Sequence, residues 1–126
     1  MTDVCEHVRA LRNALVGNAS GLELALELGT FATLVAVLRD VARVSDGAWG
    51  GASEDYARGM MFVLQTLINA GMDDPRCLTD AWEADGAFHT LEAVAETRGG
   101  RAARSHGLVC LFVNMCVKHD ATRMMR

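Results

Sequence analysis

Apolar residues recur along the chain at spacings of three and four, which is the period of an amphipathic α-helix. The clearest stripe places Tyr56, Met60, Val63, Leu64 and Leu67 on one helical face. No segment alternates apolar and polar residues over the length of a strand, so the pattern gives a sheet no support. Seven helices are predicted, over approximately residues 3–16, 20–28, 31–44, 54–70, 75–85, 88–97 and 101–118.

Capping residues and glycines mark the boundaries of these helices. Ser20 and Glu23 have the spacing of a capping box, in which each side chain satisfies the backbone N–H of the other residue. Asp74, which precedes the single proline, is a second start signal. Gly29 is expected to end its short helix in the left-handed conformation, and Gly86 ends another short helix.

The order of the predicted elements occurs twice. The segments GTFATL at 29–34 and GAFHTL at 86–91 are identical at four of six positions. Around each segment a short helix, a glycine, a medium helix, a loop and a long helix follow in the same order. Asn13, Asn69 and Asn114 each lie two residues after a large apolar residue of a long helix. A repeated helical unit cannot close its own core, so we predict stacked layers that bury apolar surface against one another.

This pattern resembles the armadillo repeat, in which a long helix is followed by a short helix, a glycine and a medium helix. The order of LRNALVGN, FVLQTLINAG, the short helix with Trp82, and LVCLFVNMCV is similar to the N-terminal region of the ataxin-ten family. The resemblance implies one all-α domain over 1–126, an armadillo/HEAT-like α-solenoid of about two and a half three-helix repeats in a right-handed superhelix. It assigns the third helix of a partial repeat to 1–17, full repeats to 20–71 and 75–117, and the start of a further repeat or a tail to 119–126.

The same resemblance implies a non-enzymatic scaffold that binds protein partners in the cytoplasm or the nucleus. Third helices line the concave face in that family, so the expected partner-binding residues are Arg9, Asn13, Gln65, Asn69, His106 and Asn114. A side-chain amide both donates and accepts, and such a row can pair with the backbone of an extended peptide. The alternative is that each amide bonds a neighbouring helix and fixes the stacking.

One feature of armadillo proteins that bind nuclear-import signals is missing from the sequence. Those proteins have tryptophan four residues before the asparagine, where this chain has Arg9, Gln65 and Cys110. That receptor activity is therefore not expected.

Two other groups of residues suggest alternatives. Trp49 lies in the glycine-rich loop 45–52, where its ring either folds over the preceding helix or is an anchor for a partner. His106 and Cys110 share a helix face, which would suit a small helical-bundle enzyme or ligand-binding protein. A cysteine nucleophile needs a base and oxyanion donors, and the sequence shows no third partner beside His106 and Cys110. Cys116 lies six residues after Cys110, about 120° around the helix, so three metal ligands would not converge. We therefore expect no catalytic residue, metal or cofactor.

Composition and charge add the remaining expectations. The four cysteines form no CxxC pair, and charged residues occupy the start of the chain, so thiols in a reducing compartment are expected. No apolar run reaches the roughly 18 residues of a membrane span. The net charge of −4 argues against general binding of nucleic acid.

The charge is also unevenly distributed. Residues 1–97 carry fifteen acidic and six basic side chains, a net charge of −9, whereas residues 98–126 carry one acidic and six basic, a net charge of +5. Arg98, Arg101 and Arg104 form a basic end patch. A short stack of repeats also has two open apolar ends. Together these features predict a homo-oligomer assembled head to tail, or part of a longer solenoid.

Overall fold

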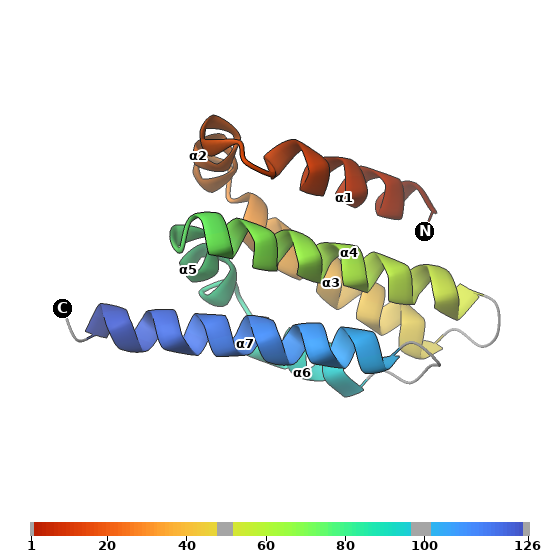
Figure 1. The fold of residues 1–126 in the computed structure, drawn as a ribbon. Helices are drawn as coiled ribbons and strands as arrows, with labels where there is room; N and C mark the ends of the chain where they lie inside the picture. The colour runs from red at the N-terminus through yellow and green to blue at the C-terminus, as the bar shows by residue number, and fades with distance from the viewer. Residues whose placement is uncertain (1, 48–51, 97–101, 125–126) are drawn as a thin grey trace.

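The computed structural model describes residues 2–47, 52–96 and 102–124. Within those ranges the chain forms helices and no strand, which confirms the predicted all-α class (Figure 1). The helices are α1 (Thr2–Leu15), α2 (Ala19–Glu27), α3 (Thr30–Gly47), α4 (Ala52–Asp73), α5 (Arg76–Trp82), α6 (Ala87–Glu96) and α7 (Ala102–Met124).

The start of α2 differs from the predicted capping box. Asn18 is the N-cap: its side-chain oxygen accepts from the N–H of Gly21 at 2.9 Å, and its side-chain nitrogen donates to the carbonyl of Ala14 at 3.2 Å. One side chain therefore both ends α1 and begins α2. Glu23 instead forms an ion pair with Arg76, so the capping box predicted at Ser20 and Glu23 is wrong.

The two matching segments have the same backbone conformation. Gly29 and Gly86 have φ of 66° and 69°, the left-handed region that favours glycine. The carbonyl of each glycine then accepts from the N–H four residues later, at Thr33 and Thr90, which begins α3 and α6. The left-handed turn predicted at Gly29 is confirmed, and it sets α2 and α3 at 73° to each other.

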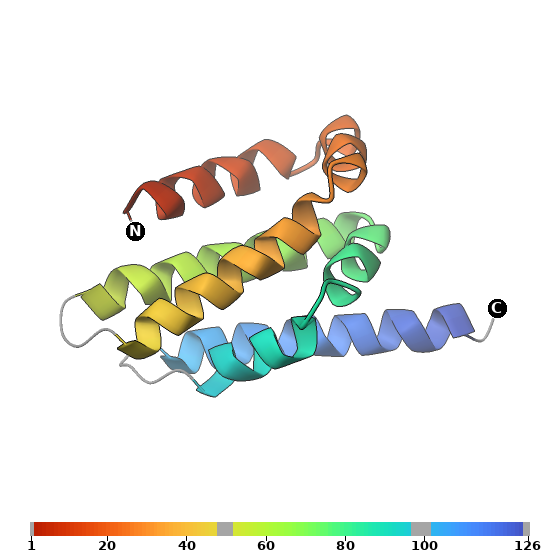
Figure 2. The same ribbon diagram turned by 180° about the vertical axis from the view of Figure 1, so that it is seen from behind.

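Corresponding helices of successive predicted units lie against each other. Helices α1, α4 and α7 lie side by side and run in the same direction (Figure 1). Helices α3 and α6 lie behind α4 and α7 and run antiparallel to them. The short helices α2 and α5 lie at one end of the molecule and run across the direction of the long helices (Figure 2). Contacts join α1 to α4, α4 to α7, α3 to α6 and α2 to α5. The order of elements that repeats in the sequence thus also repeats in space.

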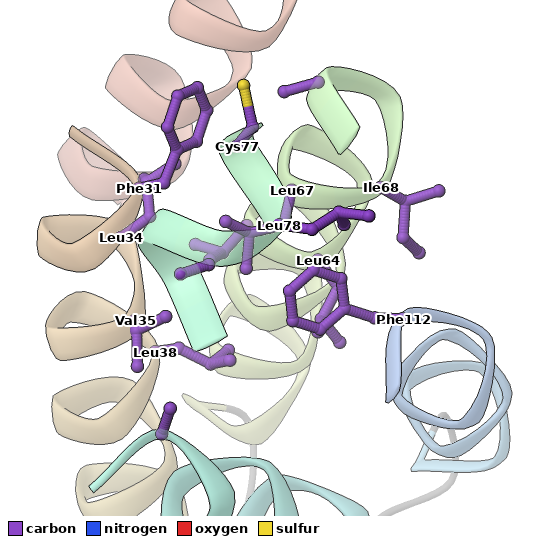
Figure 3. Packing of buried hydrophobic residues seen from close by; sticks show 14 of the residues in the cluster. Phe31, Leu34, Val35, Leu38, Leu64, Leu67, Ile68, Cys77, Leu78 and Phe112 are labelled. Carbon is purple, nitrogen blue, oxygen red and sulfur yellow. The ribbon is translucent and has the colours of Figure 1, made fainter. Parts of the chain in front are cut away.

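The apolar core lies between the two layers. Side chains of α3, α4 and α7, among them Phe31, Leu64 and Phe112, surround the short helix α5, which contributes Leu78 to the core (Figure 3). Phe31 and Leu64 are completely buried. Burial of side chains this large is the main stabilising contribution of the core.

Gly71 lets α5 approach α4 closely. A Cβ atom built on Gly71 would overlap the side chain of Leu78, which is itself buried, and would lie 3.4 Å from the terminal carbon of Met115. We expect Gly71→Ala to lower the free energy of unfolding by about 1–2 kcal/mol, because overpacking exceeds the gain in helix propensity. The matched control is Gly107→Ala in α7, where a Cβ meets nothing within 4 Å. Urea denaturation should show this control to be as stable as the wild type or up to about 1 kcal/mol more stable. Equal effects of the two changes would contradict the role of Gly71.

The two phenylalanines of the repeated segment differ in burial. Phe31 is 0% exposed, whereas Phe88 is 57% exposed and makes an edge contact with the ring of His89. Helix α5 of the following unit packs against α3 beside Phe31 (Figure 3). Among the described residues the main contacts of α6 are with α3, α5 and α7, and these leave Phe88 exposed. The expected equivalence holds for the backbone and fails for side-chain burial.

Helix α7 is longer than the predicted seventh helix. It continues without a break from Ala102 to Met124. Residues 119–124 therefore continue this helix. Of the two alternatives predicted for 119–126, the start of a further repeat is wrong for these residues, and a tail stays a prediction.

None of the described helices alone combines the length and the apolar character of a membrane span. The bent pair formed by α2 and the first part of α3 meets those criteria only when the two are counted together.

Candidate binding face

The predicted asparagines lie on the outer side of the layer formed by α1, α4 and α7. Asn13, Asn69 and Asn114 are all exposed. Leu67 and Phe112, two residues before the latter two, are 1% exposed. Two residues turn a helix by about 200°. The asparagines therefore point away from the core on one shared surface, which we call the amide face. It comprises Arg9, Arg12, Asn13, Phe62, Gln65, Asn69 and Asn114.

Arg12, which the sequence analysis did not single out, joins α1 to α4. Its Nη1 donates to Oε1 of Gln65 at 2.6 Å, and its guanidinium carbon lies 5.0 Å from the centre of the Phe62 ring. Its Nε and Nη2 reach Oδ1 of Asn13 at 3.4 Å. The amide oxygens of Gln65 and Asn13 are thus used within the protein, as the stacking alternative proposes for such amides.

A signal for this role was present in the aligned repeats. Arg12 immediately precedes its asparagine, and the corresponding residues of the later units are Ile68 and Val113. Ile68 is buried and Val113 half-buried. The position therefore lies at the flank of the helix, between the core and open solvent. An arginine at the flank can contact the next helix.

Asn69 and Asn114 differ from Asn13 in their surroundings. Within the described ranges neither of their side-chain amides forms a hydrogen bond. An exposed amide that no neighbour uses keeps its donors and its acceptor for a ligand or for water. Of the three predicted asparagines, these two are the ones whose hydrogen-bonding groups remain available.

The other predicted partner contacts fall partly outside the described structure. Trp49, Arg98 and Arg101 lie outside the described residues. His106 and Arg104 lie in α7, but their side chains are not among those described. Arg9 is exposed on α1 and belongs to the amide face.

The four cysteines are thiols outside disulfides, as predicted. Cys77 and Cys116 are 1% and 2% exposed, and burial raises the pKa of each thiol to about 12. Carboxylates add to this effect, Asp74 and Asp80 for Cys77 and Asp120 for Cys116. Both thiols are therefore protonated at neutral pH and are poor nucleophiles.

Cys110 differs from these two in being exposed on α7. It lies one turn before Asn114, at the edge of the amide face. Across the part of the chain that the structure describes, no group of three or more histidine, cysteine or acidic side chains has the arrangement of a metal site.

Accessibility predicts how fast the thiols react. We expect Ellman's reagent at pH 8 to modify Cys110 at least about tenfold faster than Cys77 or Cys116, because the reagent needs an accessible thiolate. Mass spectrometry after a short exposure identifies the modified residue. Rapid modification of Cys77 in the folded protein would contradict its burial.

A hollow of about 450 Å³ lies between the α1–α2 and α4–α5 turns. Glu23, Asp73, Asp74 and Arg76 are among its lining residues. Arg76 forms ion pairs with Asp74 at 2.7 Å and with Glu23 of α2. Oδ1 of Asp74 also accepts from the backbone N–H of Arg76, the first residue of α5, at 3.0 Å. The N-cap itself is Pro75, so the predicted cap position is one residue too early. Through its ion pairs Arg76 engages two of the three acids and joins α5 to α2.

The Asp74–Arg76 contact predicts a dependence of stability on pH. The hydrogen bond from the Arg76 side chain lowers the pKa of Asp74 below its ordinary value of 3.8. The stabilisation by the carboxylate is therefore complete above about pH 4 and is lost as the pH falls through the folded-state pKa. Asp74→Asn keeps an oxygen that can accept from the N–H of Arg76 and removes the charge. We expect it to be less stable than the wild type at pH 7, and the difference to shrink at pH 3 in urea titrations. A difference that does not change with pH would refute the role of the charge.

Comparisons with known proteins give no relative. No protein-family model, no curated protein and no solved structure matches the chain significantly. Its function is therefore inferred from its own residues and their arrangement.

Proposed function

We propose that the chain is an α-solenoid binding module of armadillo type. In this proposal the stacked layers hold the amide face rigidly for an extended segment of a protein partner. The contacts of α4 with both α1 and α7, and of α3 with α6, support the solenoid arrangement. The observation that carries the proposed function is the exposure of Asn69 and Asn114 on one layer, with no hydrogen bond to the described residues.

The spacing of the helices suits an extended peptide. Packed helices lie about 8–10 Å apart, and an extended chain rises about 3.3 Å per residue. A peptide crossing the layer would therefore meet one third helix about every three residues. Each amide can accept from a peptide N–H and donate to a peptide carbonyl, as in other recognition of extended segments.

A comparative pull-down tests this function. We expect the double variant Gln65→Ala and Asn69→Ala to lose the partner that the wild-type chain captures, because hydrogen-bonding groups of the amide face are removed. Glu92→Ala is the control, since Glu92 is an exposed residue of α6 outside the amide face. Circular dichroism verifies that both variants are folded. Equal capture by the two variants would contradict the proposal.

The sequence resemblance supports a finer assignment. We propose that the module is of ataxin-ten type, that it acts in the cytoplasm and that it is not an enzyme. The competing proposal, a helical-bundle enzyme that uses His106 and Cys110, makes a different prediction. Cys110→Ser would abolish a turnover activity while leaving the fold intact.

We also propose that the end surfaces of the stack associate, in a homo-oligomer or with further helical layers. Phe88 and Val117 of the last unit are 57% and 52% exposed, and Leu24 of the first is 55% exposed. Exposed apolar side chains of this size favour association.

Analytical ultracentrifugation tests the end surfaces. We expect the wild-type chain to form concentration-dependent oligomers, and Phe88→Glu to shift the equilibrium toward the monomer. Arg43→Glu, at an exposed position of α3, is the control and should associate like the wild type. A wild-type chain that stays monomeric at all concentrations would contradict association between copies.

A further inference from the structure

We propose that the amide face selects an acidic extended segment, with its acidic residues over α1 and an apolar residue over α7. This inference rests on the proposed function and names the chemistry of the partner. The observations behind it are the cations, the position of Arg12 and the apolar side chains of α7.

The first observation is the charge of the face. Arg9 and Arg12 of the amide face lie on α1, and Arg58 lies on α4 one turn before Phe62. None of the three forms an ion pair with a side chain that the structure describes. Glu6 lies on α1 at the position that Phe62 occupies on α4, and it is also unpaired among the described residues. The chain as a whole carries a net charge of −4. Asp73 is exposed one turn after Asn69, so three arginines lie with two described carboxylates along α1 and α4. A surface with this excess of cations on an acidic protein attracts an acidic partner to one side.

Two arginines of the other helices provide a contrast, although Arg43 of α3 also forms no ion pair with a described side chain. Arg76 of α5 forms ion pairs with Asp74 and Glu23, and Arg39 of α3 lies 3.9 Å from Asp40. Their charge is at least partly neutralised inside the protein. On α1 and α4 no described carboxylate neutralises the arginines in this way.

The second observation is that Arg12 is already held in place. Its guanidinium stacks on Phe62 and donates to Gln65 and Asn13. A guanidinium has five N–H donors in a planar fork, so donors remain for the bidentate binding of a carboxylate. Because the side chain is fixed before the ligand arrives, binding costs less conformational entropy.

The third observation gives the ligand a direction. Leu111 and Val117 of α7 are 49% and 52% exposed, on either side of Asn114 along the helix. Lys118 is also exposed, one turn after Asn114. Helix α7 therefore adds apolar side chains and one cation to the face, whereas α1 carries two arginines and no large exposed apolar side chain among those described. Two helix spacings amount to about 20 Å, which an extended peptide crosses in about six residues. Acidic and apolar positions about six residues apart would match the two ends of the face.

An acidic peptide fits the face better than the phosphates of a nucleic acid. Base recognition in single strands uses exposed aromatic rings on which bases stack. The ring of Phe62 is instead covered by Arg12. The unused amides of Asn69 and Asn114 pair with the N–H and carbonyl groups of a peptide backbone.

Fluorescence anisotropy with three labelled twelve-residue peptides tests the proposal. All three have leucines near one end, and the other end carries four glutamates, four glutamines or four lysines. We expect the glutamate peptide to bind wild-type protein about tenfold or more tightly than the glutamine peptide, the lysine peptide to bind most weakly, and added salt to weaken the glutamate peptide.

Two charge reversals locate the effect. Arg9→Glu should weaken binding of the glutamate peptide by about tenfold, because the change both removes an attraction and adds a repulsion. Arg43→Glu makes the same change at an exposed residue of α3 outside the amide face. This control should leave binding of the glutamate peptide within about twofold of wild type.

The outcomes separate this inference from the proposed function. If all three peptides bind equally and Asn69→Ala weakens each of them, the binding module stands and the acidic preference is wrong. The preference is also overturned if Arg9→Glu and Arg43→Glu have the same effect, if the glutamate peptide fails to bind at millimolar concentration, or if a twelve-nucleotide single-stranded DNA binds more tightly. Loss of a partner in the pull-down with Gln65→Ala and Asn69→Ala reports on the proposed function separately.

Discussion

Replacing Phe31 by alanine is expected to lower the free energy of unfolding by about 3–5 kcal/mol, the usual cost of removing a fully buried ring. Phe88→Ala, the same change at the matching position of the next unit, is expected to cost no more than about 0.5 kcal/mol in the monomer. The side chain of Phe31 is 0% exposed and that of Phe88 is 57% exposed. Domains of this size are stable by about 5–15 kcal/mol, so the first change removes a large part of the total.

Urea denaturation followed by circular dichroism measures both free energies. The experiment is done at low protein concentration, so that association through Phe88 does not contribute. Similar losses at the two positions would mean that Phe88 is covered in solution. A small loss at Phe31 would contradict the packing of α5 against α3.

A second large effect is expected at alkaline pH. The thiols of Cys77 and Cys116 have an ordinary pKa of 9.0, which burial raises to about 12 in the folded protein. Between these values the unfolded chain binds fewer protons than the folded chain, so the free energy of unfolding falls as the pH rises. At pH 10.5 the expected loss relative to pH 8 is on the order of 2 kcal/mol for each thiol.

Variants isolate this contribution from the other groups that titrate at high pH. The double variant Cys77→Ala and Cys116→Ala should be less stable at pH 8, because it leaves small cavities. Its stability should nevertheless fall less steeply between pH 8 and 10.5 than that of the wild type. Cys110→Ala, at an exposed position, should keep the wild-type slope. Equal slopes in all three proteins would refute the buried-thiol explanation.

Much of the fold could be predicted because its determinants are local in the sequence. Helical periodicity and glycine turns depend on neighbouring residues, and Gly29 and Gly86 define the same turn twice. The start of α2 was assigned wrongly because two residues, Asn18 and Ser20, are both good caps. The structure uses Asn18, whose side chain also reaches back to Ala14 at the end of α1. The extension of α7 to Met124 was missed because the apolar stripe weakens after Lys118.

The candidate face could be predicted only in part. The recurrence of Asn13, Asn69 and Asn114 indicated a shared surface, because each asparagine lies two residues after a large apolar residue of its helix. The role of Arg12 was not predicted, since Gln65 lies 53 residues away and the contact depends on how α1 packs against α4. The exposure of Phe88 likewise depends on which helices pack beside it. The residues of its own segment do not determine that packing.

The common direction of α1, α4 and α7 has an electrical consequence (Figure 1). Each helix carries about half a positive charge at its amino end and half a negative charge at its carboxyl end, and in parallel helices these dipoles add. Asp73 lies at the carboxyl end of α4, which increases the negative potential there. A molecule whose charges are unevenly distributed therefore experiences a torque near this layer, and it is oriented before any side chain touches it.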